Sequence, residues 1–126
     1  MKVVLDTNFF IAAYWNKKSS SRGILEKAGK GEFEVIWSKN TREELDFILG
    51  RIKAHEQFLE FVNLIFKKEN EVFPTEEISV VKDRADNRLL EAAKAGNADY
   101  LVTSDRGLLV LKTFGPTKIV KPKEFC

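Results

Sequence analysis

Short runs of apolar and β-branched residues alternate along this chain with segments of helical spacing, and this alternation limits the fold more than any other feature. The runs lie at 2–5, 33–37, 77–81, 100–103 and 118–120, and the third is the weakest. Strands of a parallel sheet are buried on both faces and therefore read as nearly continuous apolar runs. Strands that alternate with helices are typical of such a sheet. The sequence predicts a three-layer α/β/α fold around a central parallel sheet.

Helices are predicted between these strands from apolar spacings of three and four residues and from the glycines that end them. They are expected at 9–15, 21–30, 38–50, 54–69, 86–95 and 105–111, with a last turn at 122–125. The helices at 38–50 and 54–69 have no strand between them and resemble a helical hairpin. No repeat, low-complexity tract or linker divides the chain, so we expect one domain over residues 1–126.

The composition excludes several classes of protein. Cys126 is the only cysteine and His55 the only histidine, so neither an intrachain disulfide nor a zinc cage of Cys and His is possible. No apolar run approaches the length of about 18 residues that a membrane span needs. An acid at position 6 comes too early for a signal peptide, and we expect a cytoplasmic protein. The net charge of +2 neither requires nor excludes a nucleic-acid partner.

Acidic residues fall at the ends of the predicted strands. Asp6 directly follows the first strand, and Ser104-Asp105 follows the fourth. Ligands of doubly wound sheets bind beyond the carboxyl ends of the strands, where the strand order reverses. If the fourth strand lies beside the first, Asp6 and Asp105 meet at that crevice. Asp86 opens the helix before the fourth strand and can point to the same end, and Glu44 can reach across from the helix after the second strand.

Clustered carboxylates indicate a cation site. Several carboxylates in one pocket repel one another and need a positive counter-charge to stay ionised. Mg²⁺ prefers oxygen ligands, activates bound water and stabilises charge on a phosphoryl oxygen, which is the chemistry of phosphodiester hydrolysis. Asn8, Thr103 and Ser104 offer neutral donors and oxygens that can orient the carboxylates.

Four segments, in this order, resemble the PIN-domain nucleases. They are Val3–Asn8, Glu43–Leu45, Lys82–Glu91 and Ala98–Asp105. One segment alone would be a weak match, but the combination is specific and covers nearly the whole chain. The resemblance implies a parallel sheet in the order 3-2-1-4-5 and an endoribonuclease activity that depends on Mg²⁺ or Mn²⁺.

The resemblance also implies which residues are catalytic and bind metal: Asp6, Glu44, Asp86 and Asp105. Adjacent Glu43 and Glu44 point about 100° apart on a helix, and we favour Glu44 because it precedes Leu45 as in the family. Asp86 is favoured over Asp83 because it stands at the helix start, whereas Asp83 is expected to cap the helix or to contribute weakly. Neither choice is settled by the sequence.

Partners follow from the same resemblance. Many small members of the family are toxins of toxin–antitoxin pairs, similar to the VapC-type toxins, and commonly dimerise, so we expect an RNA substrate, a homodimer and a small antitoxin. Basic residues are candidates for contacts with RNA phosphates, and an ordinary solvated surface is the alternative interpretation. These candidates are Arg84, Arg88, Arg106, Lys17 and Lys18.

Two other functions compete with this hypothesis. A phosphatase or phosphotransferase of the haloacid-dehalogenase type also carries an acid after its first strand, but its usual second Asp, two residues later, is replaced here by Asn8. The second alternative is a scaffold protein with a vestigial nuclease site. The intact set of four acids argues against that alternative.

Overall fold

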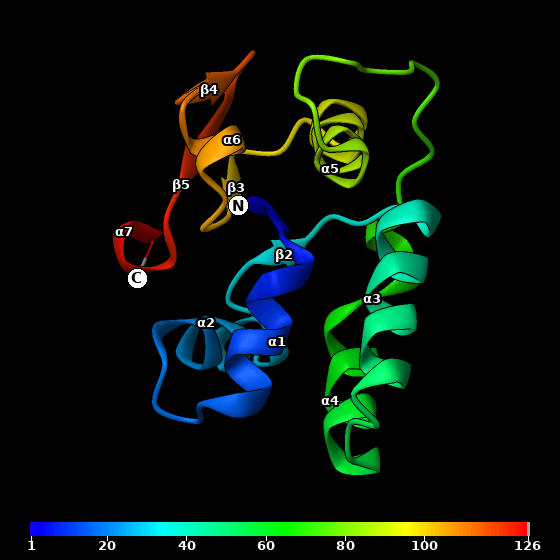
Figure 1. Ribbon diagram of the computed structural model, residues 1–126, viewed down its shortest axis with the longest axis vertical. Coiled ribbons are helices and arrows are strands. Elements are labelled where there is room, and N and C mark those ends of the chain that lie inside the picture. Colours follow the sequence, from blue (N-terminus) through cyan, green and yellow to red (C-terminus); the bar gives the residue numbers. More distant parts are fainter. Residues whose placement is uncertain (126) are drawn as a thin grey trace.

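A five-stranded sheet forms the centre of the computed structural model, which describes residues 1–125 (Figure 1). Its strands are β1 (Lys2–Leu5), β2 (Glu34–Val35), β3 (Tyr100–Val102), β4 (Thr113–Phe114) and β5 (Thr117–Val120). The strand order is β2-β1-β3-β5-β4. All neighbours are parallel except β4 and β5, which form an antiparallel hairpin.

Helices connect the strands. They are α1 (Thr7–Trp15), α2 (Ser20–Gly29), α3 (Lys39–Arg51), α4 (Glu56–Ile65), the 3₁₀ turn η1 (Lys68–Asn70), α5 (Arg84–Ala95), α6 (Arg106–Leu109) and α7 (Pro122–Phe125). Ser19 and Ser38 cap α2 and α3 through their hydroxyl groups, as their positions before helical runs favour. The consecutive helices α3 and α4 form the hairpin that the spacing predicted (Figure 1).

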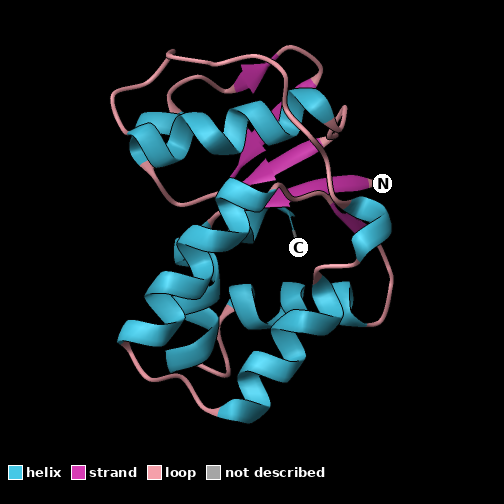
Figure 2. Ribbon diagram, turned by 90° about the vertical axis from the view of Figure 1, so that its right-hand side faces the viewer, coloured by secondary structure: helices cyan, strands magenta, loops and turns pink. Residues whose placement is uncertain are grey.

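The alternation of side chains along each strand builds one core on each face of the sheet. Val3 and Leu5 point into a core shared with α1, α2, α3 and α4, whereas Val4 points into a second core beneath α5 and α6. Figure 2 shows the sheet between these two layers of helices. The predicted three-layer α/β/α fold is therefore confirmed. Within residues 1–125, no helix is both long enough and apolar enough to cross a membrane.

The strand predicted at 77–81 is wrong. Side chains of α5, rather than a neighbouring strand, bind the backbone amides of Ile78, Val80 and Val81. The place beside β2 is instead occupied by Glu71, which makes a single parallel bridge with Trp37. The other predicted strands occur in the expected neighbouring order, as β2-β1-β3-β5.

Other boundaries also differ from the prediction. The helix expected to open at Asp86 begins at Arg84, and Asp83 caps it instead. Residues 105–111 were expected to be helical, but α6 ends at Leu109 and the chain turns back through Gly115 into the β4–β5 hairpin. Gly115 has a φ of +59°, a conformation that glycine adopts without steric cost. Helix α4 ends at Ile65 rather than at residue 69, and the indole of Trp37 donates a hydrogen bond to the carbonyl of Lys67 just beyond it.

Candidate metal centre

The parallel pairing of β1 with β3 brings two acids to one edge of the sheet. Leu5 pairs with Val102, and the amide of Asp6 donates to the carbonyl of Val102 at 3.1 Å. Asp6 and Asp105 therefore follow neighbouring strands at the same end. They share one pocket with acids from α3 and from the start of α5. The pocket is lined by Asp6, Thr7, Asn8, Asn40, Thr41, Glu44, Ile48, Asp83, Ala85, Asp86, Arg88, Leu89 and Asp105.

Three of these acids are also helix caps. Each accepts a hydrogen bond on its Oδ1 from the backbone amide two residues later: Asp6 from Asn8 at 3.3 Å, Asp83 from Ala85 at 2.8 Å and Asp105 from Gly107 at 2.8 Å. An Asp at this position satisfies an amide that the first helical turn leaves unpaired. The starts of α1, α5 and α6 thus fix the orientation of three carboxylates toward the pocket.

Thr103 connects two of the acids. Its fully buried hydroxyl donates to Oδ2 of Asp6 at 2.6 Å and accepts from the amide of Asp105 at 3.0 Å. The carboxylate of Asp6 is therefore bound on both oxygens. A single hydroxyl group sets the position of Asp6 relative to the loop that carries Asp105.

The donor set fits a hard divalent cation. Carboxylate oxygens of Asp83, Asp86 and Asp105 all lie within 4.8 Å of one another. Opposite ligands around Mg²⁺ are about 4.2 Å apart, since each bond is about 2.1 Å long. The three carboxylate oxygens therefore lie close to the separation that ligands of one ion have, and Asp6 lines the same pocket.

The pKa shifts of the acids in the pocket also favour the binding of a cation. Burial, together with the hydrogen bond and the negative charge of Asp105, raises the pKa of Asp86 to about 8. Burial also raises the pKa of Asp6, although the bond from Thr103 opposes it. The bond from Asp86, helped by the Gly107 amide, lowers the pKa of Asp105. At neutral pH the Asp86–Asp105 pair therefore shares a proton unless another positive charge replaces it.

The structure brings most of the predicted acidic-site residues together. Glu44 lines the pocket from α3 and is exposed, whereas Glu43 is not among the lining residues. Asn8 lines the pocket, while Ser104 is exposed. Asp83 both caps α5 and belongs to the closest group of carboxylates. Its spacing of three residues from Asp86 allowed this role but did not show it, because the sequence favoured Asp86 as the ligand.

The basic residues predicted to contact RNA phosphates differ in their distance from the pocket. Arg84 and Arg106 are exposed and each follows an acid of the pocket, Asp83 or Asp105. Arg88 lines the pocket, but its guanidinium contacts Glu91 at 2.6 Å. Helix α1 begins at the pocket, and its nine residues make it about 13 Å long. Lys17 and Lys18 follow its far end. The structure therefore does not bring these two lysines to the acids.

Comparisons with known proteins agree with this geometry. A sequence model of the family described as "PIN domain" matches residues 2–107. No match was found among curated proteins. Among solved structures, this protein is similar to a chain in the structure described as "Crystal structure of VapBC2 from Rickettsia felis bound to a DNA fragment from their promoter". The TM-score is 0.61 at 18% identity, over 96% of this chain and 98% of the other, which supports the fold.

Proposed function

The chain belongs to the PIN-domain family, because the family model matches residues 2–107, and on this basis we propose that it is an endoribonuclease dependent on Mg²⁺ or Mn²⁺. The observation that carries the proposal is one pocket lined by acids from four segments of the chain, beyond the carboxyl ends of β1 and β3. The acids assigned to the site are Asp6, Glu44, Asp86 and Asp105, with Asp83 as a fifth. The family and the donor chemistry support the assignment.

These carboxylates would hold the cation, and their neighbours would hold the carboxylates. A divalent ion bound there lowers the pKa of a bound water and stabilises charge on a phosphoryl oxygen. Thr103 keeps Asp6 in place, and the amide of Gly107 keeps Asp105 in place. Asp86, which shares a proton with Asp105 at neutral pH, would be deprotonated as a ligand, because a bound cation would supply the counter-charge.

RNA would approach a pocket that is itself negative, so cations are needed at its edge. Arg84 and Arg106 are exposed directly beside two of the acids. We assign them to contacts with phosphates on either side of the scissile bond, because phosphate contacts dominate the affinity for nucleic acids. Arg88 is given a structural role instead of a contact with RNA, since it forms an ion pair with Glu91.

We further propose that the protein is the toxin of a type II toxin–antitoxin pair, acting in the cytoplasm as a homodimer that a small antitoxin covers. The similarity to VapBC2 supports this proposal. Large apolar side chains are also exposed, among them Phe47 on α3 and Leu64 on α4, each at 65%. We propose that these side chains of α3 and α4 belong to the surface that the partner chain covers.

Digestion of defined RNAs tests the nuclease and one of its residue assignments. Wild type should cleave with Mn²⁺ or Mg²⁺ and lose activity in EDTA. Glu44→Gln should reduce cleavage about tenfold or more, since it removes a charge from the pocket, whereas its neighbour variant Glu43→Gln should leave cleavage unchanged. Full cleavage in EDTA would contradict the metal-dependent mechanism, and equal effects of the two Gln variants would contradict the role of Glu44.

A further inference from the structure

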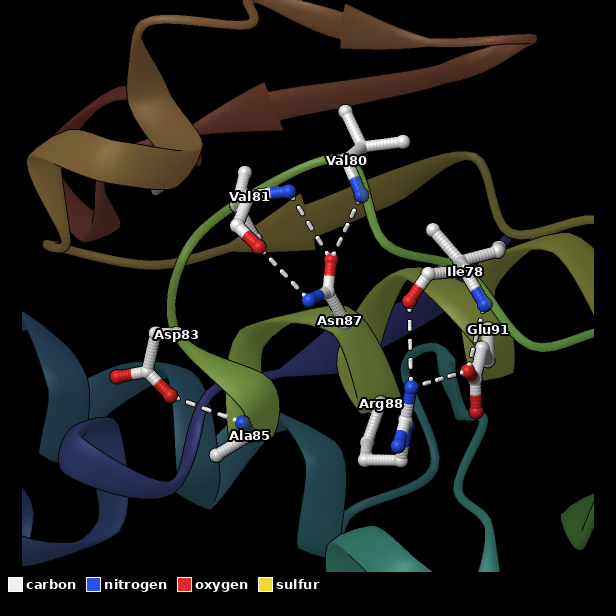
Figure 3. Close-up of polar contacts among 8 residues, drawn as sticks. All are labelled: Ile78, Val80, Val81, Asp83, Ala85, Asn87, Arg88 and Glu91. Atoms are coloured by element: carbon white, nitrogen blue, oxygen red, sulfur yellow. Dashed lines mark hydrogen bonds and ion pairs between the residues drawn. The ribbon is translucent and has the colours of Figure 1, made fainter.

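The segment before α5 is held by side chains instead of by a strand. Within residues 73–82, the structure shows no hydrogen bond between two backbone groups. The backbone of 78–81 is bound by Asn87, Arg88 and Glu91, which lie on consecutive turns of α5 (Figure 3). We call these three side chains the clamp.

Asn87 holds the end of the segment that is nearer to the pocket. Its amide is 5% exposed and is used at both ends. Oδ1 accepts from the amides of Val80 and Val81, each at 3.1 Å, and Nδ2 donates to the carbonyl of Val81 at 2.8 Å. A carboxamide accepts and donates here at once, whereas a carboxylate has no donor and an aliphatic side chain has neither group.

Glu91 and Arg88 hold the other end. Oε2 of Glu91, which is 6% exposed, accepts from the amide of Ile78 at 2.8 Å and from Arg88 at 2.6 Å. The same guanidinium nitrogen of Arg88 donates to the carbonyl of Ile78 at 3.2 Å. The buried carboxylate is therefore both neutralised and hydrogen-bonded without a sheet partner. Nε of Arg88 is buried and makes no hydrogen bond, so only one nitrogen of this guanidinium holds the segment.

The clamp lies next to the acids in the chain and in space. Asp83 follows the clamped Val81 by two residues, and Asp86 immediately precedes Asn87. Asp83 caps α5 through the amide of Ala85, and Figure 3 shows this cap on the same turn of helix as Asn87. Because the segment has no other backbone support, its path into Asp83 depends on the clamp.

We propose that Asn87 is a positioning residue of the metal centre, which acts through Asp83 and Asp86 and is supported by Arg88 and Glu91. This inference rests on the proposed function, since it assigns the clamp to the affinity of that same cation site. Outer partners that orient ligands change metal affinity by about 10- to 100-fold when they are removed. A loop anchor that served stability alone would change the melting temperature and leave the affinity as it is.

The same loop offers a matched control. Lys94 contacts Glu76 at 2.6 Å, and this exposed ion pair ties the segment to the opposite end of α5 from Asp83. Glu76→Gln removes a contact between the same two elements without touching the turn that carries the acids. Glu91→Gln is a milder change within the clamp, because it keeps an acceptor for the amide of Ile78 and loses only the charge.

Measurements of Mn²⁺ binding test the inference. The free ion is followed by its paramagnetic resonance signal, at a temperature well below the melting temperatures of all the variants. Asn87→Ala should raise the dissociation constant about tenfold or more, Glu91→Gln by less, and Glu76→Gln not at all. In metal-free protein, hydrogen exchange of the Ala85 amide should accelerate in Asn87→Ala and stay unchanged in Glu76→Gln, because only the first releases the Asp83 cap.

The outcomes separate the two proposals. If Asn87→Ala melts earlier but keeps the wild-type affinity and Ala85 exchange, the clamp is only a loop anchor and the inference fails. If Asn87→Ala does not fold, Glu91→Gln tests the same inference through a smaller change in the dissociation constant. Equal dissociation constants of Glu91→Gln and Glu76→Gln would then overturn the inference. If wild type binds no Mn²⁺, the proposed function fails, while the Ala85 exchange still decides whether the clamp positions Asp83.

Discussion

Among single residues, Thr103 shows most directly how a buried hydroxyl can organise a charged pocket. The hydroxyl donates a hydrogen bond to the carboxylate of Asp6 and accepts one from the amide of Asp105. Because the side chain is fully buried, water cannot replace either bond. The precision of the pocket therefore depends on a neutral residue as well as on the acids.

Thr103→Val should weaken both stability and cleavage. Valine has nearly the same shape but removes the donor of the buried Asp6 carboxylate and the acceptor of the half-buried Asp105 amide. Leaving a buried group unsatisfied costs about 1–3 kcal/mol. Cleavage should fall about 10- to 100-fold, because Asp6 loses the bond that orients it. Thr103→Ser should retain most of both properties, since it keeps the hydroxyl. Melting curves and RNA digestion check this, and wild-type cleavage by the valine variant would contradict the role of the hydroxyl.

The raised pKa of Asp86 predicts an unusual pH dependence. Its folded-state pKa of about 8 exceeds the ordinary value of 3.8, so the folded protein binds this proton more tightly than the unfolded chain does. The resulting stabilisation is full below about pH 4 and is lost as the pH rises through about 8. In EDTA, wild type should lose stability between these limits relative to Asp86→Asn. Urea melts across this range measure the difference, and a difference that is constant with pH would contradict the shift.

Elements show where the sequence was informative and where it was not. The strands β1 and β3 could be predicted because nearly continuous apolar runs identify strands that are buried on both faces. The run at 77–81 is rich in β-branched residues, yet its backbone is bound by Asn87 and Glu91 rather than by a strand. Local propensity does not contain this tertiary contact. The hairpin strand β4 has only two residues and left no periodic signal.

The candidate site was predictable for a related reason. Acids that follow strands or open helices fall at the ends of elements, and parallel strands bring those ends together. The pairing of Asp6 with Asp105 follows from this rule and from their positions after two predicted strands, and the register of β1 with β3 agrees with it. The role of Asp83 and the distance of Lys17 from the pocket depend on side-chain direction and on helix length, which the spacing alone did not give.

The end of α5 packs closely on Ile36, directly after β2, and glycine substitutions test this contact. A Cβ at Gly96 would lie 2.5 Å from Cγ2 of Ile36, so Gly96→Ala should destabilise the protein by about 1–3 kcal/mol. Gly50 on α3 has open space around it, and Gly50→Ala should stabilise by up to about 1 kcal/mol. Urea denaturation measures both, and equal effects of the two substitutions would show that the Gly96 contact does not limit the packing.

For the whole molecule, the proposed role predicts both an assembly and a phenotype. Expression without an antitoxin should slow growth of the host, and Asp6→Asn should relieve the effect, because the variant removes a charged group from the pocket. The purified protein should be a dimer in light scattering, which would cover part of its exposed apolar surface. Harmless expression of an active wild type would contradict the toxin role, and a monomer would contradict the homodimer.

The central claim is that Asp6 and its neighbours form a cation site that costs stability when it is not neutralised. Asp6 is buried with a raised pKa, so a neutral Asn at this position should make the metal-free protein more stable. Wild type should gain stability from Mn²⁺, roughly 2.7 kcal/mol at a hundredfold excess over Kd. Asp6→Asn should gain much less, and Asp46→Asn, outside the pocket, should gain as much as wild type.

Thermal melts of these three proteins, each in EDTA and in Mn²⁺, test that claim most directly. Asp6→Asn is expected to melt above wild type in EDTA, and its melting temperature is expected to rise less than that of wild type when Mn²⁺ is added. Equal shifts of the melting temperature in wild type and Asp6→Asn, or no shift in either, would contradict it.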